Sequence, residues 1–395
     1  MAGRNKNKVN TFAKEIFNEI SNTWDKSRRS SVFREAPRVF EVIQADAMKS
    51  EEMLNLARST KVLVACAGPY GRYGEASVKA AVEGKCHYVD ITGETPWVQK
   101  MVRKYGDAAK KAGITLCSFS GYDCVPAEFA MVKCQDEIER NKDTLVSLDL
   151  VFKAKGGGLP RGTIHTLLDG VEHGMSFKKR SGPRLPGVIP PPAYKSEMKS
   201  SLGLMHWLLP VYTNGRFTGP NFMSAVNVPV MLWSSSQLSR KSFRIRDRNA
   251  VGPSSLFSLF GLVPTLIYEW ILFCAVFLLL LPPVRWFIRR FLKTYTFDGA
   301  PKGVVTLRAS ATSSHKNNNV NFEMKIPGDP GIYATGLLAS AVAYAILDCE
   351  SSSGKKKMKS GFVPPVAALN ESGCLDSRLK IFGVDFSLGS KVKGA

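Results

Sequence analysis

Paired cysteines and metal-binding cysteine spacings are lacking in this 395-residue chain. Its eight cysteines form no CxxC pair and no cysteine–histidine cluster, so no metal site is predicted. Scattered thiols of this kind are typical of a reduced protein that faces the cytosol. The first residues, MAGRNKNKVNTF, are basic and contain no apolar core of a signal peptide. We therefore expect a protein that is not secreted.

Acidic residues are also scarce. The chain has 33 Asp and Glu against 54 Lys and Arg, which gives a formal net charge of +21 and favours anionic partners. The excess of cations is concentrated between Ser176 and Ala250, just before an apolar segment, and this favours a lipid headgroup layer over a nucleic-acid groove. Basic and aromatic residues are not interleaved as in RNA-binding domains, so we expect no nucleic-acid partner.

A third absence is the glycine-rich turn that binds phosphate, because no GxGxxG occurs near the start of the chain. The sequence nevertheless alternates strands and helices. Apolar runs predict strands at 38–43, 61–67, 87–92 and 114–119, and helical spacing predicts helices at 47–58, 75–84, 95–112 and 126–139. This alternation is typical of an α/β domain with a parallel sheet, here with its first βα unit missing.

The pattern changes after residue 140. A strand is predicted at 144–153, two more within 301–326 on either side of 313–319, and a helix at 336–347. These elements predict a second, α+β domain.

The longest apolar stretch covers residues 254–283, where Glu269 is the one charged residue. Tryptophans lie near both ends of its second half, and it is followed by four cations, Arg285, Arg289, Arg290 and Lys293. Because a spanning helix needs about 20 apolar residues, three interpretations remain: a short span from about Leu266 to Leu281, a shallow hairpin within one leaflet, or a buried helix of the second domain. The flanking cations and tryptophans favour contact with a bilayer or lipid droplet.

Three loops follow the predicted parallel strands, at 67–74, 90–94 and 120–126. Ligands bind at the carboxyl ends of the strands in open α/β sheets, so we expect these loops to share one crevice. Gly68 would let the backbone approach a ribose or nicotinamide, and Pro69 would stiffen that turn. The polar candidates for a substrate pocket are Asp90, Glu94, Gly121 and Asp123; each carboxylate could contact a ligand or cap its own turn.

The order and spacing of these motifs resemble those of the saccharopine dehydrogenase-like oxidoreductases, a family that includes bacterial trans-acting enoyl reductases. The motifs are VACAGPYGRYGE at 64–75, CHYVDITGE at 86–94 and GYDCVP at 121–126. Further similar segments are GGLPRGTI at 157–164, GDPGIYAT at 328–335 and GFVPPVAAL at 361–369.

The resemblance implies a Rossmann domain followed by an α+β domain, and NADP or NAD as cofactor. It places Arg4 near the adenosine ribose, where a cation suits the 2′-phosphate of NADP, and adds Ala67, Gly68, Pro69 and Tyr70 as cofactor-binding residues. It also implies that the chain begins one βα unit late. The apolar segment resembles one in eukaryotic members that associate with lipid droplets and membranes.

We therefore expect an incomplete dinucleotide-binding domain at 1–140, a second domain at 141–253 and 296–395, and a membrane or lipid-droplet segment at 254–295. One functional hypothesis is an NAD(P)-dependent oxidoreductase that acts on a hydrophobic, lipid or glycolipid substrate at a cytosol-facing membrane. The other is a non-catalytic lipid-droplet or membrane protein that keeps the fold without the cofactor. Neither a catalytic residue nor the oligomeric state follows from the sequence.

Overall fold

The structure is a computed structural model. It describes residues 1–23, 41–155, 158, 160–169, 171–172, 196–197, 201–202, 209–213, 215–251, 258–295, 297, 303–315, 318–351 and 357–390. Within these residues the predicted strand at 38–43 is described only from residue 41.

A four-stranded parallel sheet forms the first part of the molecule, in the order β12-β5-β4-β3. Its strands are β3 (Val62–Ala65), β4 (His87–Asp90), β5 (Thr115–Cys117) and β12 (Gly361–Phe362). All pairs are parallel, so the carboxyl ends of the strands lie at one edge. β4 is buried along its whole length, as expected for a strand covered on both faces.

A separate two-stranded parallel sheet is made of β1 (Ala2–Gly3) and β2 (Ile43–Gln44). In the described part of the chain, β3 is an edge strand: it pairs with β4 on one side and with no strand on the other. The side chain of its Val64 is exposed. The predicted α/β fold is thus observed, with its strands divided between two sheets.

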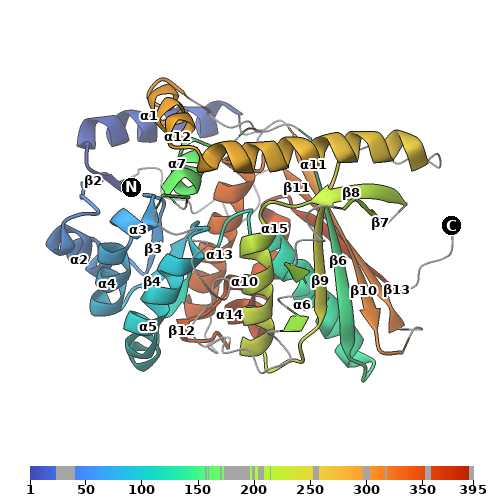
Figure 1. The fold of residues 1–395 in the computed structure, drawn as a ribbon. Coiled ribbons are helices and arrows are strands. Elements are labelled where there is room, and N and C mark those ends of the chain that lie inside the picture. The colour runs from blue at the N-terminus through green and yellow to red at the C-terminus, as the bar shows by residue number, and fades with distance from the viewer. Residues whose placement is uncertain are drawn as a thin grey trace.

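Helices with one apolar face cover the outer side of the parallel sheet: α2 (Ser50–Arg58), α4 (Glu75–Gly84) and α5 (Thr95–Ala112) (Figure 1). In α5 the buried residues recur at helical spacing, among them Val98, Met101 and Tyr105. The helix ends at Gly113, whose φ of +71° suits glycine at a helix carboxyl terminus.

A seven-stranded sheet forms the second part, in the order β13-β11-β10-β6-β9-β8-β7. The strands are β6 (Leu145–Lys155), β7 (Val211–Thr213), β8 (Arg216–Pro220), β9 (Arg244–Ala250), β10 (Val304–Ser313), β11 (Val320–Pro327) and β13 (Asp385–Ser390). All neighbours are antiparallel except β6 and β9. One face is apolar and the other polar, as in β11, where buried residues alternate with half-buried or exposed ones.

A layer of helices lies between the two sheets (Figure 1). It consists of α6 (Val125–Arg140), α10 (Ser224–Gln237), α13 (Tyr333–Ser351), α14 (Pro365–Leu369) and α15 (Cys374–Ile381). α13 packs on β3 and β4 of one sheet and on β11 of the other. Residues 361–362 also return to the parallel sheet, although the sequence assigned all of 296–395 to the second domain. One hydrophobic cluster joins residues of both sheets, and a second surrounds the parallel sheet and its outer helices. The domain boundaries remain a proposal.

The apolar segment forms α11 (Ser258–Leu280), which lies across one side of the molecule (Figure 1). Gly261, Thr265 and Glu269 form a buried stripe at intervals of four, whereas residues 273–278 are all exposed. Phe260–Leu280 is long and apolar enough to cross a membrane, and 11% of the window is buried inside the protein. The interpretation as a buried core helix therefore does not hold for its second half. After Leu281 the chain turns into α12 (Pro282–Phe291).

Candidate functional site at the carboxyl edge of the parallel sheet

The loop after β3 is exposed and folds back over the end of its strand. Residues 66–68 are solvent-exposed and the Gly68–Pro69 peptide bond is cis. Pro69 precedes the short helix α3 (Tyr70–Tyr73). The Tyr70 hydroxyl donates a hydrogen bond to the Ala65 carbonyl at 2.8 Å, and its ring packs beside Trp97 with 5.4 Å between centroids. Residues 66–68 of the anchored loop remain exposed to solvent.

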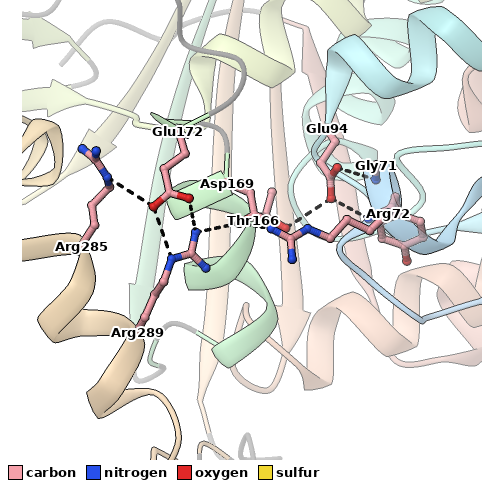
Figure 2. Close-up of polar contacts among 9 residues, drawn as sticks. Gly71, Arg72, Glu94, Thr166, Asp169, Glu172, Arg285 and Arg289 are labelled. Atoms are coloured by element: carbon pink, nitrogen blue, oxygen red, sulfur yellow. Dashed lines mark hydrogen bonds and ion pairs between the residues drawn. The ribbon is translucent and has the colours of Figure 1, made fainter. Parts of the chain in front are cut away.

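Glu94 joins the loop after β4 to the loop after β3. Its two carboxylate oxygens accept hydrogen bonds from the backbone amides of Tyr70 and Gly71, each at 2.8 Å. Thr166 of α7 (Arg161–Asp169) adds a longer contact of 3.4 Å from its hydroxyl (Figure 2). An anionic group at the amino end of α3 meets both free amides and the positive end of the helix dipole. Glu94 thus clamps two of the three predicted loops together.

Asp90 joins the loop after β4 to the loop after β5. Its buried carboxylate accepts hydrogen bonds from the Ser118 hydroxyl at 2.7 Å and from the amides of Thr92 and Phe119 at 3.0 and 3.3 Å. Burial raises the pKa of this carboxyl to about 6, although the hydrogen bonds act in the opposite direction. The fully buried Asp90 is thus hydrogen-bonded both to its own loop, at Thr92, and to the next loop, at Ser118 and Phe119.

The third loop is held by the amino end of α13. A Cβ atom on Gly121 would lie 3.0 Å from Cγ2 of Thr335, so the glycine allows close contact. The Tyr122 amide donates a hydrogen bond to the Thr335 hydroxyl at 3.3 Å. The next residue, Asp123, is half-buried, and its Oδ2 lies 3.8 Å from the position of a Cβ on Gly93. The loops at 90–94 and 120–126 are therefore adjacent.

Asp123 differs from Asp90 in having no hydrogen-bond partner for its carboxylate within the described residues. Burial raises its pKa to about 6. A carboxyl group with a raised pKa, at the edge of a sheet and beside exposed residues, is the type of group that binds a ligand or exchanges a proton with it.

The predicted site residues are thus distributed as follows. Ala67, Gly68, Pro69, Tyr70, Asp90, Glu94, Gly121 and Asp123 lie in three loops that contact one another at one edge of the parallel sheet. Arg4 is exposed at the end of β1 in the smaller sheet, and no hydrogen bond or ion pair joins it to the loop at 67–70 in the described part of the chain. The roles assigned to these residues remain predictions.

A dinucleotide fits this edge in part. Gly68 carries no side chain and residues 66–68 are exposed, so a ribose or nicotinamide could lie against this turn. The amides at the amino end of α3 are occupied by Glu94, so they offer no donors to a pyrophosphate. Within the described residues no glycine-rich turn supplies such donors, and no group of His, Cys, Asp and Glu could hold a metal ion.

Ion pairs connect this edge to the segment that follows the apolar helix (Figure 2). Arg289 of α12 contacts Asp169 at 2.8 Å and Glu172 at 2.7 Å, and Asp169 also contacts Arg72 of α3 at 3.0 Å. Arg285 lies 3.5 Å from Glu172. α7 thereby bridges α12 and the loop after β3.

Sequence reasoning missed several residues of this site: Ser118, Thr166, Thr335, Arg72 and Asp169. Thr335 is the last residue of the motif at 328–335, which was recognised without a role. Arg72 and Asp169 are 97 residues apart, and oppositely charged residues at such a separation carry no pairing signal in one sequence.

Residues 10–117 match the family model of the saccharopine dehydrogenase NADP binding domain. A lipid droplet localized protein of Caenorhabditis elegans is 31% identical over 179 residues, which is 45% of this chain and 39% of that protein. A saccharopine dehydrogenase-like oxidoreductase of Mus musculus is 31% identical over 97 residues, 25% of this chain and 23% of that protein. Among solved structures, an apo saccharopine dehydrogenase (L-Glu forming) of Saccharomyces cerevisiae covers 99% of this chain and 93% of its own, with 14% identity and a TM-score of 0.48.

These matches confirm the family predicted from the three loop motifs, and they confirm NADP or NAD as the cofactor at the level of the domain family. The matched region spans about two fifths or less of the curated relatives. Residues 10–117 are thus similar to the NADP-binding domain of the saccharopine dehydrogenases, and part of the chain is similar to saccharopine dehydrogenase-like oxidoreductases.

Proposed function

We propose that this protein is an NADP- or NAD-dependent oxidoreductase that acts on a hydrophobic, lipid or glycolipid substrate at a lipid surface. The observation that carries the proposal is the meeting of three strand-end loops at one edge of the parallel sheet, in a chain whose first part matches an NADP-binding domain. Ligands of open α/β sheets bind at this edge. The bound dinucleotide would supply a hydride.

The chain's own residues would position the ligands. The exposed residues 66–68 would lie along the cofactor, with Tyr70 and Glu94 holding that loop in place. The Arg4 side chain would bind a phosphate. Asp123 would accept or donate a hydrogen bond to the substrate, because its carboxylate has no partner in the described residues and its pKa is raised to about 6.

Titration of the full chain with NADPH and with NADH tests the cofactor. Trp97 packs against Tyr70, so binding at 66–68 should change the tryptophan fluorescence in a saturable way. We expect tighter binding of NADPH than of NADH. Absence of saturable binding for both dinucleotides would refute the oxidoreductase proposal for this chain.

We propose further that α11 and α12 lie in one leaflet of a membrane or on a lipid droplet, facing the cytosol. Exposed apolar side chains cover α11, including Trp270, Ile271 and Phe277, while its buried stripe holds the helix against the protein. A helix fixed along the protein surface suits shallow insertion better than a span. The relative in Caenorhabditis elegans is named a lipid droplet localized protein, which supports this location.

A charge in the exposed half of α11 tests the membrane contact. Phe277→Asp should move the protein from the floating to the soluble fraction with phosphatidylcholine vesicles, because a charged residue in apolar lipid is strongly unfavourable. The control is Val146→Asp, a substitution of another exposed apolar residue, in β6. Equal flotation of the Phe277→Asp variant and the unchanged protein would contradict the contact.

A non-catalytic lipid-surface protein is the second candidate. The observation in its favour is that Glu94 occupies the amides of Tyr70 and Gly71, so that the described edge lacks donors for a pyrophosphate. Flotation that depends on Phe277, together with no dinucleotide binding, would support this candidate.

A further inference from the structure

A basic groove crosses the polar face of the seven-stranded sheet, away from the parallel sheet and its loops. This open groove has a volume of about 510 Å³. Five cations line it: Lys153 and Lys155 of β6, Arg216 of β8, Arg308 of β10 and Lys325 of β11. We call these residues and the space between them the basic groove.

Strand register explains why the cations gather. Lys153 pairs with Thr306, and Thr306 pairs with Lys325, so these residues form one row across β6, β10 and β11. Lys155 follows two positions after Lys153 and therefore points to the same face. Neighbouring strands are about 4.8 Å apart and residues two apart about 7 Å. Charges on strands one or two positions apart in the sheet thus lie within roughly one screening length and reinforce one another.

Carboxylates balance the groove only partly. Glu323 contacts Arg308 at 2.8 Å and Lys325 at 3.3 Å. Within the described residues, no ion pair involves Lys153, Lys155 or Arg216. Burial, and to a smaller extent the charge of Arg308, lower the pKa of Arg216, as expected where cations are close together without enough anions. The groove therefore has an excess of positive charge.

The groove is next to the docking site of the apolar helix. Its lining includes Ala250 at the end of β9, and Arg248, two positions earlier on the same face of that strand, lies 3.7 Å from Glu269 of α11. A Cβ on Gly219 of β8 would lie 2.6 Å from the Tyr268 ring. Exposed apolar residues of α11, such as Val263 and Ile267, thus belong to the same end of the sheet as the cations.

We propose that the basic groove binds the phosphate headgroup of an anionic lipid while α11 inserts into the apolar layer beside it. A lipid is favoured over a soluble phosphate compound because an anion-binding groove and an exposed apolar helix are adjacent, and together they match the two parts of a phospholipid. The inference rests on the lipid-surface contact proposed for α11.

Vesicle flotation of the full chain tests the groove. The probes are phosphatidylcholine vesicles and phosphatidylcholine vesicles that contain phosphatidic acid. The double variant Lys153→Ala with Arg216→Ala is compared with Arg103→Ala with Lys111→Ala, which removes the same charge from exposed positions of α5. Urea unfolding of both variants establishes that they fold.

The groove variant should partition at least about tenfold more weakly onto phosphatidic acid vesicles, since each cation near an anionic surface contributes roughly a factor of five. Binding to phosphatidylcholine alone should not change, and the control variant should resemble the unchanged protein. Equal weakening of both variants, or no weakening of the groove variant, would overturn the proposal.

Two further outcomes identify other causes. If the unchanged protein binds neither kind of vesicle, the lipid contact of α11 is wrong, and the groove proposal falls with it. Calorimetric titration with glycerol 3-phosphate covers the soluble source. Saturable binding that the groove variant loses, while its vesicle binding stays unchanged, would overturn the lipid assignment in favour of a soluble phosphate ligand.

Discussion

Removal of the Glu94 carboxylate should release the loop after β3. Glu94→Ala deletes both acceptors of the Tyr70 and Gly71 amides, which lie 2.8 Å from the carboxylate oxygens. A hydrogen bond to a charged group contributes about 1.5–3 kcal/mol. Gly71 is exposed, so its amide can be rehydrated after the substitution, and we expect a total loss of about 2 kcal/mol in the free energy of opening this loop.

Hydrogen exchange measures this opening directly. Amides in the peptide covering 66–74 should exchange about 30-fold faster in Glu94→Ala, because about 1.4 kcal/mol corresponds to a factor of ten. Glu94→Gln keeps one acceptor and should give an intermediate rate. Glu83→Ala is the control, because Glu83 is exposed and its contact with Lys79 is a 3.7 Å surface pair.

Unchanged exchange of 66–74 in Glu94→Ala would refute the clamp. Acceleration spread evenly over the whole chain would also contradict it, since that result would mean global destabilisation instead of local opening.

Three other perturbations have defined outcomes. Burial raises the pKa of Glu128 to about 7; the folded state therefore binds more protons than the unfolded state between about pH 4.5 and 7, and stability falls as pH rises through this range. Glu128→Gln should remove that fall. Measured by urea unfolding, the free energy of unfolding of this variant relative to the unchanged protein should therefore rise by about 2 kcal/mol from about pH 5 to pH 8. Parallel pH profiles of the two proteins would contradict the burial argument. Gly121→Ala should lower the free energy of unfolding by about 1 kcal/mol, because the new methyl group would press on Cγ2 of Thr335. Adding Thr335→Ser, which keeps the hydroxyl and removes Cγ2, should recover that stability. Failure of this rescue would exclude the contact as the cause. Arg289→Ala removes the contacts with Asp169 and Glu172 and should speed hydrogen exchange in α12, whereas the exposed Arg290→Ala should not; equal rates in the two variants would show that the ion pairs do not hold α12.

Local patterns in the sequence predicted the regular elements well. The ranges predicted for α4 and α5 match the observed helices, because amphipathic spacing and the glycine after α5 are local signals. The strands are shorter than predicted, as in β5, where three residues pair out of the six expected. The next residues, Ser118 and Phe119, are buried but belong to the loop held by Asp90. An apolar run in the sequence therefore predicted burial here, but not the end of the strand.

The position of the candidate site was also predictable, because parallel strands bring their carboxyl ends to one edge. The division of roles among the carboxylates was not. Asp90 and Asp123 both lie at the ends of predicted strands or just after them. Asp90 is fully buried with three partners, whereas Asp123 is half-buried and has none among the described residues. The contributions of Thr335, Thr166 and residues 361–362 depend on segments far apart in the sequence, for which a single chain gives no pairing information.

Hydrogen exchange of the full chain with and without NADPH tests the shared crevice most directly. If the three loops form one dinucleotide site, saturating NADPH should slow exchange together in the peptides covering 66–74, 90–94 and 118–124, and leave the seven-stranded sheet unchanged. Protection confined to other parts of the chain, or no protection at all, would contradict the account.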